Sequence, residues 1–272
     1  MTIIIGIGSS ASRLSTYLAT LAYHQKHQVK SKKVLSCQVT PIGNDANNVL
    51  RKRGCDILSQ GLELQPENLP SEPDEFIFYN FIINIERMGL FWQKFHERIN
   101  FFIQNTPDDV FSCIKKDFLQ DKIYNHLLTD CQGYLFVIDG TSHREDEKYA
   151  DLLEKFTTDL TQRNPQGCRI AFTVTKCDLS ELWVNRDDPR GMVQRRFPKM
   201  YEILENWTQE DKGKVEYFTT SSFGVFGKYC EPNSIIQSKS KGGTMAVIRN
   251  PKEWQPFGLI EPLYWLCTGK ML

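Results

Sequence analysis

The chain has 272 residues, of which 40% are hydrophobic, and its 33 lysines and arginines are balanced by 33 aspartates and glutamates. This length and apolar content are enough to bury a large core, which argues against general disorder. A net charge of zero gives no long-range attraction to DNA, RNA or an acidic membrane, and no apolar run approaches the roughly 18 residues that a membrane span needs. We therefore expect neither nucleic acid nor a membrane as a partner.

Eight cysteines are spread along the chain, and none of them forms a Cys-x-x-Cys pair or stands at zinc-finger spacing from a histidine. They lie in apolar contexts, so we expect buried, free thiols in a reducing compartment. Met1 leads directly into an apolar, strand-like run without the pattern of a signal peptide. Together these features predict a cytoplasmic protein.

The first third of the chain alternates apolar strands with helical patterns. A short buried strand at 3–5 runs into glycines and serines, and a helix follows at 13–23, where apolar residues recur at helical spacing. A second strand is expected at 34–39. From residue 42 a helical stretch gives way to a proline-containing loop that ends near residue 73.

The middle of the chain is rich in aromatic residues. Residues 76–85 have a strong strand pattern, 90–95 suit either a second strand or a short turn of helix, and 98–104 suit another strand. A helix at 115–128 then leads to 133–139, a continuously apolar run that is typical of a central parallel strand buried on both faces.

The last part of the chain repeats this alternation. The expected elements are a helix at 147–160, a strand at 169–174, a helix at 191–207, a strand at 215–220, a mobile loop at 238–243 and a closing helix at 260–267. Strands separated by helices predict an α/β fold with a doubly wound, mostly parallel sheet and helices on both faces. We expect a single domain over 1–272, with elaborations around 40–100 and 228–258, and ligands at the carboxyl ends of the strands.

Polar residues follow the strand at 169–174 directly. Thr175, Lys176 and Asp178 stand there in the order Thr-Lys-x-Asp. A carboxylate accepts two hydrogen bonds, which suits the ring N–H and the amino group of guanine, whereas adenine offers no such pair of donors. The lysine stem can pack flat on the base, and the threonine can tie adjoining loops. The alternative is an ordinary helix start with Asp178 as its N-cap.

The next strand is followed by Thr220, Ser221, Ser222 and Gly224. In these two runs the sequence resembles the Ras-like and translation-factor class of P-loop GTPases, which carries an Asn/Thr-Lys-x-Asp motif and a Ser-Ala-Lys type motif at such places. The resemblance implies the P-loop NTPase version of the fold, and backbone amides around Ser221 and Ser222 that meet the guanine oxygen. A polar turn at a strand end is the alternative interpretation of this second run.

The same resemblance places a phosphate loop after the first strand. A Walker loop needs Gly-x-x-x-x-Gly-Lys-Ser/Thr, because its amides and lysine hold the phosphates and its hydroxyl binds magnesium. The spacing from Gly8 to Ser15 fits, but Arg13 stands at the second glycine and Leu14 at the lysine; a register from Gly6 also lacks the lysine. The residues implied in phosphate contact are Gly8, Arg13, Ser15 and Thr16, with Ser15 as the Mg²⁺ ligand when a triphosphate is bound.

The second metal motif of the family, Asp-x-x-Gly, is also altered. Asn105, Thr106, Pro107 and Asp108 occupy its place, so an amide replaces the carboxylate that serves magnesium. Base-reading features are thus kept, while phosphate, metal and hydrolysis features are lost together. This pattern indicates a pseudo-GTPase. The first helix and residues 253–266 are similar to bacterial GTPase-like proteins of conflict and signalling gene clusters, which implies a bacterial origin.

Asp139 ends the strand at 133–139, and His143 follows in a run of charged residues. An acid–base pair of these two residues is one interpretation. A solvated helix start, with acidic residues near the positive end of the helix dipole, is the interpretation that we favour.

Three hypotheses about function follow. The first is a GTPase-like switch or scaffold subunit that acts through a protein partner and binds GTP or GDP weakly or binds no nucleotide. The second is an active GTPase with an atypical phosphate loop, in which Arg13 or a partner supplies the missing charge; the sequence assigns no catalytic residue for it. The third is a nucleotide-free interaction domain on the same fold.

Overall fold

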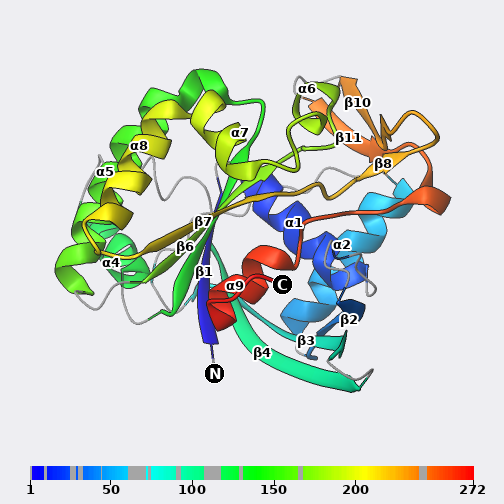
Figure 1. Ribbon diagram of the computed structural model, residues 1–272, viewed down its shortest axis with the longest axis horizontal. Helices are drawn as coiled ribbons and strands as arrows, with labels where there is room; N and C mark the ends of the chain where they lie inside the picture. The colour runs from blue at the N-terminus through cyan, green and yellow to red at the C-terminus, as the bar shows by residue number, and fades with distance from the viewer. Residues whose placement is uncertain are drawn as a thin grey trace.

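The computed structural model describes residues 2–8, 11–24, 29, 33–43, 45–60, 72, 75–89, 93–106, 118–128, 131–164, 168–238 and 244–272. Within these ranges the side chains of 11–13, 45–46, 56–60, 118–121, 123, 236–238 and 244–246 are not described. Figure 1 shows a central twisted sheet with helices on both sides.

A mixed sheet forms the centre of the fold, with its strands in the order β2-β3-β4-β1-β5-β6-β7. The strands are β1 (Thr2–Gly8), β2 (Val34–Pro41), β3 (Phe78–Met88), β4 (Lys94–Thr106), β5 (Gly133–Asp139), β6 (Arg169–Thr175) and β7 (Lys214–Thr219). From β4 to β7 neighbouring strands run parallel, whereas β3 is antiparallel to both β2 and β4. The carboxyl ends of β1, β5, β6 and β7 therefore meet at one edge of the sheet, where ligands bind in folds of this class.

Helices cover both faces of the sheet (Figure 1), as expected for an α/β fold. One face carries α1 (Ala11–Tyr23), α2 (Asp45–Gln60) and α9 (Glu261–Thr268); the other carries α4 (Phe118–Leu127), α5 (Asp146–Arg163), α7 (Pro189–Arg196) and α8 (Pro198–Gln209). Short helical turns lie at η3 (His143–Glu145), α6 (Ser180–Trp183) and η4 (Pro251–Glu253). Among the described helices, none has both the length and the apolar character that crossing a bilayer requires.

A hydrophobic core lies on each face of the sheet, and β5 contributes to both. Leu135 and Val137 pack in the first core with α1 and α9, whereas Tyr134 and Phe136 pack in the second with α5. All seven residues of β5 are buried. The prediction of a central parallel strand at 133–139 is confirmed, because only a strand covered on both faces can be apolar on both.

Two predictions of elements need correction. The single helix expected at 191–207 is two helices, α7 and α8, that meet at Phe197 and Pro198. Proline has no N–H to donate and pushes the preceding residue out of the helical region, and Phe197 has φ −133° and ψ 58°. The two elements expected at 90–95 and 98–104 are represented by one strand, β4, which begins at Lys94; residues 90–92 lie outside the described residues.

The chain between β7 and α9 adds two small antiparallel sheets beside α6 (Figure 1). Their strands are β8 (Val225–Phe226), β9 (Glu231–Pro232), β10 (Ser234–Ser238) and β11 (Thr244–Ile248). Asn233 holds this region together: its side chain donates to the carbonyl oxygens of Asn250 (3.0 Å) and Glu253 (3.3 Å) and accepts from the Asn250 N–H (2.7 Å). The mobile loop expected at 238–243 joins β10 to β11, and its residues 239–243 lie outside the described residues.

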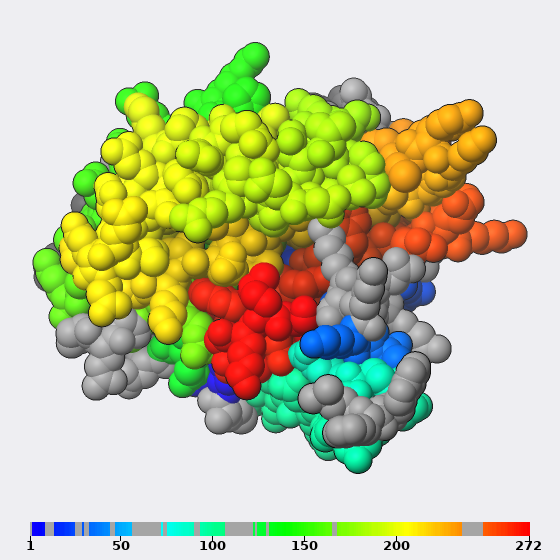
Figure 2. Space-filling view, in the orientation of Figure 1, coloured from blue at the N-terminus to red at the C-terminus, as the bar shows by residue number. Residues whose placement is uncertain are grey.

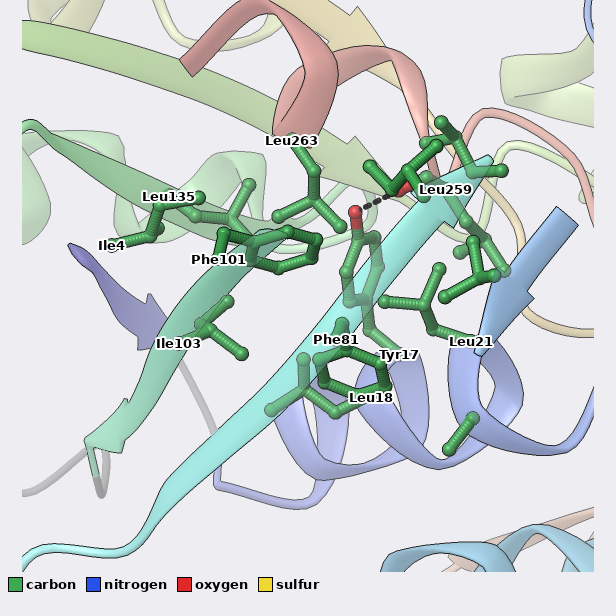
Figure 3. Close-up of a cluster of buried hydrophobic side chains, with 14 of the residues drawn as sticks. Ile4, Tyr17, Leu18, Leu21, Phe81, Phe101, Ile103, Leu135, Leu259 and Leu263 are labelled. Carbon is green, nitrogen blue, oxygen red and sulfur yellow. Dashed lines mark hydrogen bonds between the residues drawn. The ribbon is translucent and has the colours of Figure 1, made fainter. Parts of the chain in front are cut away.

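Tyr17 ties α1 to the segment that precedes α9. Its ring is fully buried in the first core, near Phe81, Phe101 and Leu263, and its hydroxyl donates to the carbonyl oxygen of Leu259 (Figure 3). Burial raises the pKa of Tyr17 well above its ordinary value, so the hydroxyl stays protonated and remains a donor.

The prediction that the cysteines are buried is wrong at two positions. Among the described residues, Cys55 on α2 and Cys230 in the turn before β9 are exposed, and no described cysteine forms a disulfide. Cys113 lies outside the described residues. Cys55 lies on the exposed side of α2, a position that its context in the sequence does not reveal.

Replacing Tyr17 by phenylalanine should lower the free energy of unfolding by about 1–3 kcal/mol, because the buried carbonyl of Leu259 loses its donor. Denaturant unfolding measures this change. The exposed Tyr229 supplies the matched control, Tyr229→Phe, which should stay within about 0.5 kcal/mol of the wild type. Equal small effects of the two substitutions would contradict the prediction.

Candidate functional site

Most of the residues singled out in the sequence lie at the carboxyl edge of the parallel strands. Gly8 and Thr175 are the last residues of β1 and β6, and Ser221 lies two residues beyond the end of β7. The structure brings Thr175, Lys176, Asp178 and Ser221 together, although more than 40 residues separate the two motifs in the chain.

Asp178 is the centre of this group. Its Oδ1 accepts a hydrogen bond from the Ser221 hydroxyl at 2.6 Å, and its Oδ2 accepts one from the Ser234 hydroxyl at 3.3 Å. Only 3% of Asp178 is exposed. We call Lys176, Asp178, Ser221 and Ser234 the Asp178 cluster. It is a buried carboxylate held from both sides by hydroxyl groups.

The backbone around the cluster is fixed by contacts between strand ends. The Thr175 hydroxyl donates to the carbonyl of Ile138 at 3.1 Å, which ties β6 to β5. The Cys177 N–H donates to the carbonyl of Thr220 at 3.1 Å, which ties the same turn to the segment after β7. Lys176 has φ +61°, in the left-handed region, so a sharp turn places Asp178 back against the sheet edge.

Burial determines the protonation of Asp178. Loss of water raises the pKa of this carboxyl above its ordinary value, while the hydrogen bonds from Ser221 and Ser234 and the charge of Lys176 act in the opposite direction. An acceptor-only carboxylate in such a place favours any ligand that offers two N–H donors, as the edge of guanine does.

Lys176 joins the ends of β5 and β6 through an ion pair. Its Nζ lies 2.9 Å from Oδ2 of Asp139, whose side chain is 3% exposed while that of the lysine is 44% exposed. The other oxygen of Asp139 accepts from the N–H and the hydroxyl of Thr141. His143 contacts Arg196 at 3.2 Å, so the structure gives Asp139 a different partner from the one in the acid–base interpretation.

The segment 221–224 after β7 is covered by the chain that precedes α9. The N–H of Ser221 donates to the carbonyl of Phe257 at 3.0 Å, and the indole N–H of Trp254 donates to the carbonyl of Ser222 at 2.8 Å. The N–H groups of Phe223 and Gly224 donate to the Ser221 hydroxyl. Within the described residues, the N–H of Ser222 has no acceptor. This N–H could therefore donate a hydrogen bond to an oxygen atom of a ligand.

Two glycines allow these backbones to approach so closely. Gly224 has φ +70°, and a Cβ added there would lie 2.0 Å from the carbonyl oxygen of Gln255. Gly258 has φ +69°, and a Cβ there would lie 2.0 Å from the carbonyl oxygen of Thr219. Any side chain at either position would push the two segments apart.

The phosphate end of the expected site is built differently. Leu14, at the place where the resemblance requires a lysine, is fully buried and belongs to the first core. Thr16 lies one turn before Thr20, whose hydroxyl donates to the Thr16 carbonyl at 2.8 Å. The side chain of Arg13 lies outside the described residues. Leu14 therefore cannot take the place of the phosphate-binding lysine.

Ser15 is the expected magnesium ligand, and its surroundings suit a cation poorly. Its side chain is 1% exposed, and its oxygen accepts a hydrogen bond of 3.4 Å from the amide Nδ2 of Asn105. A donor directed at the hydroxyl oxygen opposes a cation there, and magnesium prefers carboxylates. In the described part of the chain there is no group of three or more His, Cys, Asp or Glu residues that could hold a metal ion. Pro107 and Asp108 lie outside the described residues.

Sequence reasoning missed Ser234. It follows Asn233 at the start of β10 and reaches Asp178 from 56 residues away. No motif in the sequence marks it, because its role depends on the pairing of β10 and β11 and on the way Asn233 anchors them.

Replacing Asp178 by asparagine should change how stability depends on pH. The folded protein holds the proton of Asp178 more tightly than the unfolded chain, whose carboxyl has the ordinary pKa of 3.8. The stability that this proton contributes is present below 3.8 and is lost as the pH rises through the raised pKa of the folded state. The free energy of unfolding of the wild type should therefore fall relative to that of Asp178→Asn as the pH rises above 3.8.

Urea denaturation at a series of pH values measures this difference. The exposed Asp211 gives the control for the substitution itself, since Asp211→Asn should leave the free energy of unfolding within about 0.5 kcal/mol of the wild type at neutral pH. Parallel curves for wild type and Asp178→Asn would show that the carboxyl is not perturbed.

Replacing Lys176 by methionine should destabilise the fold by about 1–3 kcal/mol, because the buried carboxylate of Asp139 loses its cation. Thermal or denaturant unfolding provides the measurement. Lys199→Met removes the ion pair of Lys199 with Glu147, in which both side chains are exposed, and should cost much less than Lys176→Met because water screens the pair. Similar losses in the two variants would contradict the assignment.

No model of a known protein family matches the chain, and no curated protein is significantly similar to it. The chemistry of the Asp178 cluster and the construction of the opposite end are thus the grounds for a functional interpretation.

Proposed function

We propose that this chain is a GTPase-like domain that binds guanine nucleotide weakly, does not hydrolyse it, and works as a switch or scaffold subunit through contact with a protein partner. The observation that carries the proposal is the contrast between the two ends of the site. Lys176, Asp178 and Ser221 are assembled at the strand ends, whereas Leu14 lies in the core at the place of the phosphate-binding lysine.

The base-reading end has groups that complement guanine. The carboxylate of Asp178 can accept from the ring N–H and the amino group, and the N–H of Ser222 can donate to the guanine oxygen. The exposed part of Lys176 supplies an aliphatic stem that can lie against the base. Adenine has the opposite pattern of donors and acceptors, so this set favours GDP and GTP over ATP.

The arrangement of the first elements supports the P-loop version of the α/β fold. Strand β1 lies inside the sheet between β4 and β5, and α1 follows it, which is the order of strand and helix in a phosphate-loop unit. Helix α1 begins at Ala11, so residues 11–15 of the expected loop are already helical. The unit lacks the lysine, and Ser15 is buried against Asn105. We therefore derive no hydrolytic step and no role for Mg²⁺ in binding.

Exposed apolar residues near the base-reading end support a protein partner. Val184 follows α6, Tyr229 lies between β8 and β9, and Ile235 lies in β10. These segments are neighbours in Figure 1 and form one side of the surface in Figure 2. Large apolar side chains that remain exposed at one end of a molecule are a common feature of interaction surfaces.

Calorimetric titration with GDP and GTP, with and without Mg²⁺ and with ATP as the comparison, tests the proposal. We expect guanine-selective binding with a Kd of roughly 0.1–1 mM, which corresponds to only about 4–5.5 kcal/mol of binding free energy, with no effect of Mg²⁺ and no release of phosphate. Asp178→Asn exchanges an acceptor for a donor, so it should lose GDP and gain xanthosine diphosphate, which carries an oxygen in place of the amino group. Asp211→Asn should change neither affinity.

Two results would overturn the proposal in different ways. Magnesium-dependent turnover that is lost in Ser15→Ala would identify an active GTPase with an atypical phosphate loop. The absence of binding at millimolar GDP, in the wild type and in all variants, would leave an interaction domain without a nucleotide.

A further inference from the structure

Strand β10 forms one edge of the small sheet that it makes with β11. The two strands run antiparallel without a break in register. Next to this ladder, the N–H of Arg249 donates to the carbonyl of Asn233 at 3.0 Å. Hydrogen-bonded pairs alternate along an antiparallel ladder, so the backbone N–H and C=O groups of Ser234, Ile236 and Ser238 point away from β11. No other strand in the described ranges of the chain pairs with them.

This edge is firmly held. Asn233, directly before the strand, is fully buried, and its side chain is hydrogen-bonded to Asn250. The hydroxyl of Ser234 donates to Asp178, and Ile248, which lies opposite Ser234 in the ladder, is buried in the first core. The strand therefore does not have to be ordered when a partner binds. Its outward N–H and C=O groups are a ready template for a further strand.

The two edge strands of the large sheet are protected against such pairing, and β10 is not. Strand β7 carries Lys214 and Glu216, and charged residues on an edge strand oppose the addition of another strand. On β2, Val39 is fully buried and Pro41 has no N–H to donate. Residues Ser234–Ser238 of β10 are Ser-Ile-Ile-Gln-Ser, which contains neither a charge nor a proline.

A second copy of this chain is the partner that such a strand fits. An uncharged strand can lie antiparallel to its own copy about a two-fold axis without placing like charges opposite each other. Pairing centred on Ile236 joins Ile236 to Ile236 of the second copy and Ser234 to Ser238, so outward N–H groups meet outward C=O groups. Ile235 is 41% exposed, and Tyr229, in the turn that leads to β9, is 81% exposed. Both add apolar surface close to this edge.

We propose that this chain forms a two-fold homodimer in which β10 pairs with β10 of a second copy. The inference rests on the proposed function only in naming the protein partner that the function invokes, and the association needs no nucleotide. Pairing makes one sheet that is continuous across both copies, which removes an exposed edge from each. Because Ser234 on the same strand is bonded to Asp178, the dimer contact adjoins the Asp178 cluster.

Sedimentation velocity over a range of protein concentrations tests the dimer. We expect a reversible dimer with a Kd on the order of 10 µM, as suits a small interface. Ile235→Lys and Ile235→Glu should each weaken it about tenfold or more, because like charges then approach each other across the axis. An equimolar mixture of these two variants should form a mixed dimer that is tighter than either variant alone. Loss of packing by itself would not produce this rescue.

Two further variants separate the backbone edge from a general surface effect. Ile236→Pro removes an N–H that points away from β11 and should abolish the dimer, because the ladder with β11 does not use that group. Leu35→Lys is the matched control and should leave the dimer unchanged, because Leu35 is 44% exposed, close to the value for Ile235, but lies on β2. Thermal unfolding checks that each variant is folded.

Hydrogen–deuterium exchange locates the contact. In the wild type, the peptide that carries Ser234–Ser238 should exchange more slowly as the protein concentration rises, because the outward N–H groups become hydrogen-bonded in the dimer. In Ile235→Lys its exchange should be independent of concentration over the same range. The peptide that carries β2 should show no dependence on concentration in either protein.

The outcomes distinguish the dimer from the proposed function. A wild type that remains monomeric at millimolar concentration overturns the dimer and leaves the binding of guanine nucleotide to its own test. A dimer that Ile235→Lys, Ile235→Glu and Ile236→Pro all leave intact overturns the assignment to β10. A dimer that these variants disrupt, with rescue in the mixture and no effect of Leu35→Lys, supports the proposal even where GDP does not bind.

Discussion

A single buried carboxylate sets the geometry at the carboxyl edge of the parallel strands. Asp178 lies almost out of contact with water, and a carboxylate in that place is unfavourable unless its oxygens are hydrogen-bonded. The hydroxyls of Ser221 and Ser234 supply those bonds, and they come from the segment after β7 and from the start of β10. The need to satisfy Asp178 therefore joins the central sheet to a region that lies outside it.

The surroundings of Asp178 and those of Leu14 and Ser15 differ in their chemistry, although both lie at the carboxyl edge of the parallel strands. At Asp178 polar groups are kept in a dry environment and satisfied one by one, which preserves a defined arrangement of donors and acceptors. Leu14 and Ser15, in contrast, belong to the interior of the protein. Leu14 stabilises the fold by burying its apolar side chain, and the hydroxyl of Ser15 accepts a hydrogen bond from the amide of Asn105. A site that recognises a base does not require a second site that binds its phosphates, and the proposed function depends on the first alone.

Local sequence patterns predicted the strands of the sheet well. They did not predict most contacts between residues that are far apart in the sequence. Strand β5 was predicted to the residue, since a continuous apolar run bounded by Gly133 and Asp139 permits few alternatives. Pro198 causes the break between α7 and α8. The prediction followed the apolar periodicity of this stretch and overlooked the proline, although a proline is a local signal for a helix boundary. The contact of Ser234 with Asp178 has no local signal at all, because it depends on how two distant segments pack.

The same distinction applies to the candidate site. The Thr-Lys-x-Asp run showed which residues could meet a base, and the structure places Thr175, Lys176 and Asp178 on one turn. The ion pair of Lys176 with Asp139 could not be read from the sequence, because β5 and β6 are neighbours only in the folded sheet. Charged residues at the ends of adjacent parallel strands are nevertheless a signal that could have suggested it.

The close approach of two backbone segments at Gly224 and Gly258 limits which residues can stand at these two positions. Side chains in the two cores can be exchanged for others of similar volume, but at these two positions even a methyl group would collide with a carbonyl oxygen. Distant relatives could therefore differ from this chain in nearly every core residue and still have to keep both glycines, one just after the strand that follows the Thr-Lys-x-Asp turn and one just before the closing helix.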